Sequence, residues 1–245
     1  MKSSRQVLTA SASRLILAFA ACGCASAPLI AKETPSLENT PLLTEAKHQF
    51  ETMKSTFYQY RIEVDRKAGS YRYDCVGFVS YSLQQAAPEA WASVFKATGI
   101  GKNRIPSPPK YQVFFANLST TSQPGWQAVT KTNDLRPGDI VSWDHRTKSA
   151  VGHAVILAST PLPLPGKEGS WKVEVYDSTG SPHSDDTRPT DDRAQPLPSN
   201  GRRSGLGRGT MVLVADPATG RLTGLAWSLK AKAVTVPIAA GRPVS

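Results

Sequence analysis

The stretch Tyr73-Asp74-Cys75-Val76-Gly77-Phe78-Val79 decides how the fold and the chemistry of this chain are interpreted. Asp74 is a favourable N-cap and an apolar stripe follows it, so the stretch predicts a helix over residues 75–87. A cysteine in the first turn lies beside free backbone N–H groups at the positive end of the helix dipole, which stabilise a thiolate. The same N–H groups can bind an oxyanion. The alternative is a helix whose first buried residue is simply a cysteine.

The number and position of the cysteines bear on whether Cys75 is a catalytic or a core residue. The chain has three cysteines, Cys22, Cys24 and Cys75, and the first two lie in or beside an expected export signal. A mature exported chain would then keep Cys75 alone, although exported proteins usually pair their cysteines. A lone cysteine is either a small buried core residue or a catalytic thiol.

Residues 1–27 have the pattern of a secretory signal. They carry three positive charges and no acid, with an apolar core at 15–21 and a small-x-small cleavage site at Ala25-Ser26-Ala27. A lipoprotein signal that ends at Cys22 is the alternative, although Phe19 stands where such signals usually have leucine. Both interpretations predict an exported protein of the periplasm or cell envelope, either free or anchored in the membrane through a lipid on Cys22.

Length and charge limit the organisation and the partners. A chain of 245 residues allows one medium domain beside the signal. We expect a linker at 28–41, a catalytic domain at 42–230 and a C-terminal tail at 231–245. The net charge of +10 falls to +7 without the signal, which favours an anionic envelope polymer as partner. No motif indicates nucleic-acid binding.

Hydrophobic periodicity predicts helices in the first part of the domain and strands in the second. Helical spacing covers 42–62 and 75–87, and a short helix is expected at 110–116. The region 184–205 is polar and rich in proline, which predicts a long surface loop. The order indicates an α+β fold in which N-terminal helices pack on an antiparallel sheet. The expected strands are 139–143, 153–158, 171–177, 210–215 and 222–227, the last two forming a hairpin.

Two further segments accompany the cysteine. Residues 135–143 (LRPGDIVSW) place a Pro-Gly turn before a strand, and residues 152–157 (GHAVIL) place His153 at the start of another strand. A histidine at the start of a strand could face a thiol, although an isolated histidine there is more often structural.

The three segments together resemble the NlpC/P60 family of cysteine peptidases, which is papain-related and CHAP-like. DCVGFV is similar to the family's DCSGFV signature, LRPGDIVSW to its L-x-PGD strand, and GHAVIL to its histidine-bearing strand. They occur in the family's order and cover roughly residues 56–180. The resemblance implies a papain-like α+β fold and an enzyme that cuts amide bonds in peptidoglycan stem peptides.

The resemblance also implies roles for individual residues. Cys75 would be the nucleophile, with its backbone N–H in the oxyanion hole, and His153 the general base. Asp177 would orient the imidazole, with His183 as the competing candidate.

The flanking positions carry smaller roles. Asp74 and Val76 flank the nucleophile, and Val76 departs from the family's serine, so its backbone N–H is the group of interest. Tyr60 is the preferred tyrosine for oxyanion support, with Tyr71 and Tyr73 as alternatives.

No cofactor or metal is expected, because the four histidines and one mature cysteine show no ligand spacing. Residues 201–209 (GRRSGLGRG) lack a phosphate-binding pattern and suggest a basic loop or the lead-in to a strand. Two other functions stay open: an inactive envelope-binding module on the same fold, which the Val76 departure motivates, and a Cys–His acyltransferase.

Overall fold

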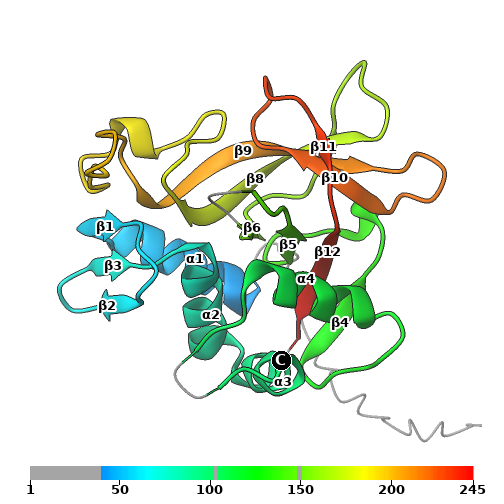
Figure 1. Ribbon diagram of the computed structural model, residues 1–245, viewed down its shortest axis with the longest axis horizontal. Coiled ribbons are helices and arrows are strands. Elements are labelled where there is room, and N and C mark those ends of the chain that lie inside the picture. Colours follow the sequence, from blue (N-terminus) through cyan, green and yellow to red (C-terminus); the bar gives the residue numbers. More distant parts are fainter. Residues whose placement is uncertain (1–39, 102–103, 148–150, 245) are drawn as a thin grey trace, which may run out of the picture. The chain divides into compact units, whose positions relative to one another are not determined.

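The computed structural model describes residues 40–101, 104–147 and 151–244. The signal at 1–27, the cleavage and lipidation sites and most of the expected linker therefore lie outside the described residues. The described chain has helices first and an antiparallel sheet second, which confirms the α+β class (Figure 1). Its helices are α1 (Pro41–Thr52), α2 (Cys75–Ala86), α3 (Pro88–Thr98) and α4 (Pro108–Asn117), with 3-10 turns η1 (Thr132–Asp134) and η2 (Arg188–Thr190).

The main sheet of the described chain has nine strands in the order β11-β10-β9-β8-β6-β5-β12-β4, with β7 added beside β8, and neighbouring strands are antiparallel. The β9–β10 pair is the hairpin that the sequence predicts. The strands are β4 (Trp126–Val129), β5 (Ile140–Asp144), β6 (Gly152–Leu157), β7 (Leu162–Pro163), β8 (Ser170–Thr179), β9 (Gly205–Ala215), β10 (Leu222–Ala226), β11 (Val234–Thr235) and β12 (Ile238–Pro243).

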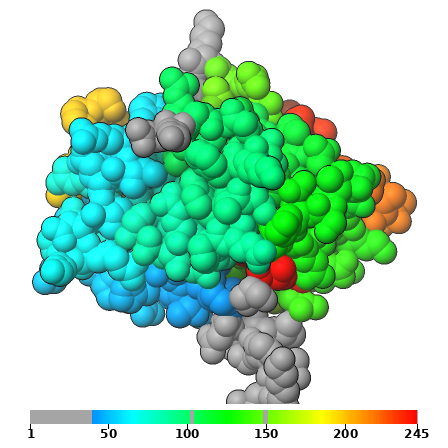
Figure 2. All heavy atoms as spheres, turned by 90° about the horizontal axis from the view of Figure 1, so that it is seen from below, coloured from blue at the N-terminus to red at the C-terminus, as the bar shows by residue number. Residues whose placement is uncertain are grey.

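Alternation along the strands divides the core between the two faces of this sheet. Ala154, Ile156 and Tyr176 face the helices and join the cluster that includes Phe78 of α2. Val155 and Trp143 point to the other face, where a second buried cluster forms. Figure 2 views the helix side, whose surface is made mainly by the blue-to-green residues of the first part of the chain.

The predicted helix over 42–62 is wrong beyond Thr52. The chain leaves α1 at Met53, which has extended backbone angles, and forms a small second sheet in the order β1-β3-β2. Its first strand also contacts the 184–205 region, because Thr56 forms an isolated bridge with Ala194. Tertiary pairing therefore overrides the helical spacing of the apolar residues here. The strands are β1 (Ser55–Phe57), β2 (Glu63–Asp65) and β3 (Ser70–Arg72).

The predicted helices at 75–87 and 110–116 correspond to α2 and α4, and Pro88 begins α3 directly after α2. The expected linker at 28–41 ends differently from the prediction, because Thr40 caps α1 and Pro41 is its first residue. A proline suits the first helical turn, since its missing N–H has no partner there in any helix.

The C-terminal segment 231–245 is not a tail in its described part, which corrects the expected domain boundary. Strand β12 lies between β5 and β4 in the main sheet, and Ala240 is paired on both sides. An ion pair fixes its end: Arg242 Nε lies 2.7 Å from an oxygen of Asp139, the acid of the PGD turn. The folded domain thus extends to the last residues of β12.

The predicted surface loop at 184–205 is also only partly correct. It contains η2, and the side chain of Arg188 is 1% exposed. A polar, proline-rich composition suggested solvent, but the arginine is buried and forms ion pairs with Asp177 and Asp186.

Candidate functional site

The first half of the site is the start of α2. Asp74 caps this helix, because its Oδ1 accepts the Gly77 N–H at 2.7 Å. A side chain at Gly77 would come within 2.8 Å of Tyr73 Cβ, so glycine allows the cap to pack closely. Cys75 is therefore the first residue of the helix, as the sequence predicts, and it is 4% exposed.

The thiol of Cys75 lies beside the start of β6. In the described chain β6 pairs with β8 at Ile156 and Leu157 and not nearer its start. There the backbone N–H of Ala154 donates to the thiol, together with that of Val76. The thiol thus lies next to the residue that follows His153.

Burial raises the pKa of the Cys75 thiol well above its ordinary value, and the charges of Asp74 and Asp177 raise it further. The N–H groups of Ala154 and Val76 act in the opposite direction without reversing the shift. The thiol is therefore neutral at neutral pH, rather than the thiolate that the helix dipole alone would favour.

His153 forms the second half of the site. Its Nε2 lies 2.7 Å from Oδ2 of Asp177, and its ring packs against Trp143 and Trp227 with centroids 5.4 and 5.0 Å apart. Burial lowers the pKa of His153, and Asp177 only partly opposes this effect. A neutral ring whose Nε2–H donates a hydrogen bond to Asp177 keeps a lone pair on Nδ1, which is the form of a general base.

Among the described residues, no direct hydrogen bond joins the Cys75 thiol to the His153 ring. Bonds between catalytic groups are often long without substrate and shorten in the reactive complex. The two residues are linked indirectly. The thiol accepts the N–H of Ala154, which follows His153, and the charge of Asp177 raises the pKa of both Cys75 and His153.

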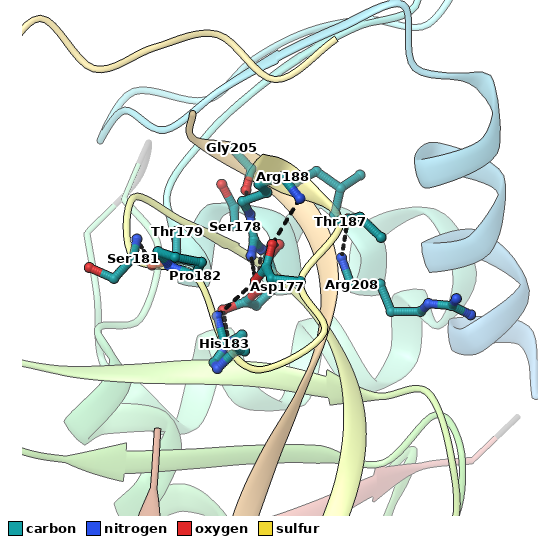
Figure 3. A network of polar contacts seen from close by, with 12 residues as sticks. Asp177, Ser178, Thr179, Ser181, Pro182, His183, Thr187, Arg188, Gly205 and Arg208 are labelled. Carbon is teal, nitrogen blue, oxygen red and sulfur yellow. Dashed lines mark hydrogen bonds and ion pairs between the residues drawn. The ribbon is translucent and has the colours of Figure 1, made fainter. Parts of the chain in front are cut away.

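Asp177 is the centre of a buried polar network (Figure 3). Its Oδ2 also contacts His183 Nε2 at 3.0 Å, and its Oδ1 forms an ion pair with Arg188. Burial acts to raise the pKa of Asp177, but Arg188, His183 and the hydrogen bonds from both histidines hold it well below the ordinary value. Asp177 is therefore a carboxylate throughout the neutral range.

Alternate glycines on β9 make room for this network. Added Cβ atoms would lie 2.7 Å from Arg188 at Gly207 and 2.8 Å from His183 Cβ at Gly209. Gly207 is also the direct partner of Asp177 in the β8–β9 register. The GLGRG part of the 201–209 segment is thus a strand with a glycine face, as the strand lead-in interpretation suggested, and not a loop.

The tyrosines are placed differently from the sequence preference. Tyr60 is 78% exposed, and Tyr71 and Tyr73 are fully buried and hydrogen-bonded to α1. Tyr58, which the sequence analysis did not single out, is the tyrosine near the thiol. Its pKa is raised by burial first, and then by the charges of Cys75 and Asp74. The phenol of Tyr58 is therefore neutral at neutral pH.

The sequence analysis placed Asp177 and His183 in competition, whereas the structure brings both to one point. It did not find Arg188 or Trp227. The alternation of glycines at 205, 207 and 209 was an available signal, because a strand that repeatedly lacks side chains on one face leaves space for bulky neighbours.

No helix in the described parts of the chain is long and apolar enough to cross a membrane. The same residues contain no group of three or more His, Cys, Asp or Glu side chains arranged to hold a metal ion. Comparison with protein-family models, with curated proteins and with solved structures gives no match to this chain.

Proposed function

We propose that this chain is a cysteine hydrolase of the NlpC/P60-like, papain-related kind, which cuts amide bonds through Cys75, His153 and Asp177. One observation carries the proposal: a cysteine at the start of a helix accepts the N–H of the residue next to a histidine whose far nitrogen binds a buried carboxylate. These neighbours supply the residue types that covalent catalysis uses as nucleophile, base and orienting acid, which supports the proposal.

The charge states of the two halves suggest the order of events. Thiol and imidazole are both neutral at rest, because burial raises the pKa of Cys75 and lowers that of His153. The thiol proton moves to Nδ1 of His153 as sulfur attacks the carbonyl carbon. Asp177 stabilises the imidazolium that forms, since its carboxylate already accepts a hydrogen bond from the Nε2–H of His153.

The remaining steps return the enzyme to its starting state. The backbone N–H of Cys75 at the helix start and the neutral Tyr58 hydroxyl are the candidate donors to the oxyanion. His153 gives its proton to the amine as the C–N bond breaks, which leaves an acyl-enzyme thioester. Water, deprotonated by His153, then attacks the thioester and releases the acid and the free thiol.

We propose peptidoglycan stem peptides in the cell envelope as the substrate. The resemblance of the three motifs to NlpC/P60 peptidases supports this substrate, and the excess of 29 basic over 19 acidic residues suits an anionic polymer. The exported location rests on the signal pattern at 1–27.

One observation favours a second candidate, a binding module without activity. Cys75 is 4% exposed and its pKa is raised, so the resting thiol reacts slowly in the absence of a ligand that opens the site. Such a module would bind cell-wall fragments without changing them.

Digestion of purified peptidoglycan, with mass analysis of the products, separates these candidates. We expect new amine and carboxyl ends with the intact chain and none with the Cys75→Ala variant, which should fold because alanine suits a first helical turn. Equal digestion by both proteins would reject Cys75 as the nucleophile. Binding of fragments without products, by both proteins, would favour the binding module.

A further inference from the structure

The inference concerns His183, and its catalytic part rests on the proposed function. Both ring nitrogens of His183 face oxygen acceptors: Nε2 lies 3.0 Å from Asp177 Oδ2, and Nδ1 lies 2.8 Å from the carbonyl oxygen of Trp227. A neutral imidazole has one N–H and one lone pair, so either tautomer would set a lone pair against an oxygen. Only the doubly protonated ring satisfies both contacts.

The charge balance of the network leads to the same conclusion. Asp177 and Asp186 supply two buried carboxylates, and Arg188 pairs with both of them. A neutral His183 would leave one negative charge uncompensated in a region where these side chains are at most 1% exposed, which is costly. A cationic His183 brings the group to zero net charge. Its ring also stacks on Trp227 with centroids 4.2 Å apart, a favourable place for a cation.

We infer that His183 is a permanently protonated positioning residue, which holds Asp177 in place as a carboxylate and keeps His153 in its neutral, basic form. His183 touches neither the thiol nor a reacting atom, and it acts through the oxygen of Asp177 that both histidines share. It is therefore a fourth member of the site and not a rival of Asp177 for the third place.

The charges around His183 give the sign of its effect. Asp177 on β8 faces it from one side, Arg188 of η2 and Asp186 of its own segment from another, and His153 on β6 lies across Asp177. Burial acts to lower the pKa of His183, but Asp177 and the Trp227 carbonyl outweigh it, so the pKa is raised. For His153, burial and then the charges of His183 and Arg188 lower the pKa.

The protonation state can be read directly by ¹⁵N NMR of the histidine rings in the intact chain without substrate. We expect both nitrogens of His183 to stay protonated between about pH 5 and 8, the range in which free histidine titrates. The His183 signals are assigned through the bonds from the backbone, so no variant needs to fold. A His183 ring with one bare nitrogen at neutral pH overturns the inference, whether or not the chain hydrolyses peptidoglycan.

The catalytic part is tested by the pH profile of peptidoglycan hydrolysis. Loss of the positive charge in His183→Gln should raise the pKa of His153 and move the acidic limb of kcat/KM upward by about one pH unit. His48→Gln, a change at an exposed position of α1, is the matched control and should leave the limb in place. A lower rate in His183→Gln with an unmoved limb would reduce His183 to a structural role. Absence of hydrolysis by the intact chain would instead reject the proposed function and leave the NMR result standing.

Discussion

The two halves of the candidate site are built in opposite ways. The cysteine half is local: Asp74, Cys75 and Gly77 form one helix start, and the thiol is held neutral by burial and a neighbouring acid. The histidine half is assembled from segments far apart in the chain, including β6, β8 and η2, and its acid stays ionised because cations surround it. One helix start positions the nucleophile, and a buried network of ion pairs and hydrogen bonds from several elements positions the base. Perturbing each half should therefore have different consequences.

The largest expected effect follows removal of the arginine that anchors the histidine half. Arg188→Ala leaves Asp177 and Asp186 short of their cation and should lower the free energy of unfolding by about 3–5 kcal/mol. Urea unfolding measures the change. Arg193→Ala is the matched control, because Arg193 pairs with Asp191 nearby but is 36% exposed, and it should cost about 1 kcal/mol or less. Similar losses in both variants would mean that the buried network does not anchor this half.

A smaller effect is expected from the strand beneath the same network. The added methyl of Gly207→Ala would lie 2.7 Å from an arginine that its ion pairs hold in place, which should cost about 1–3 kcal/mol. Gly101→Ala provides the comparison, since a Cβ there meets nothing within 4 Å. If Gly207→Ala proves as stable as Gly101→Ala, the glycine face of β9 is not needed to house Arg188.

The smallest change is expected in the cysteine half. Asparagine also caps helices, so Asp74→Asn should keep stability within about 0.5 kcal/mol and remove a charge that raises the pKa of Cys75. Cys75 should then react faster with iodoacetamide at neutral pH. Asp74→Ala removes the same charge but loses the cap, at a cost of about 1 kcal/mol. An unchanged alkylation rate in both variants would show that Asp74 does not restrain the thiol.

Asp74 should also make the free energy of unfolding depend on pH in a definite direction. Burial raises its pKa from 3.8 to about 6, so the folded protein holds this proton more tightly than the unfolded chain. Its contribution to stability is complete below pH 3.8 and is lost as the pH rises through about 6. Asp74→Asn should flatten this part of the stability curve, and unfolding midpoints measured across the window would reveal it.

The sequence predicted the cysteine half well because its signals are contiguous. The N-cap, the apolar stripe and the glycine at 77 occur within a few residues, and the helix begins at Cys75 as expected. His153 and Asp177 were also placed on strands that the structure contains, and their contact confirms that they lie together.

The rest depends on contacts that no local pattern encodes. Arg188 lies in a polar, proline-rich stretch and is buried only because Asp177 and Asp186 attract it. The apolar residues of 53–62 follow a helical spacing, yet residues 55–57 form strand β1 because they pair with β3. The segment after 230 is interrupted by Pro237 and Pro243, yet β12 pairs with both β5 and β4 in the main sheet.

The central claim is that Cys75 and His153 act as one unit, and alkylation of Cys75 at a series of pH values tests it most directly. Peptide mapping by mass spectrometry would follow this residue in the intact chain and in His153→Gln. We predict that the intact chain shows an extra rise in rate below pH 6.5, the ordinary pKa of histidine, as the buried ring loses its proton, and that the variant lacks it. Identical profiles for the two proteins would contradict the claim.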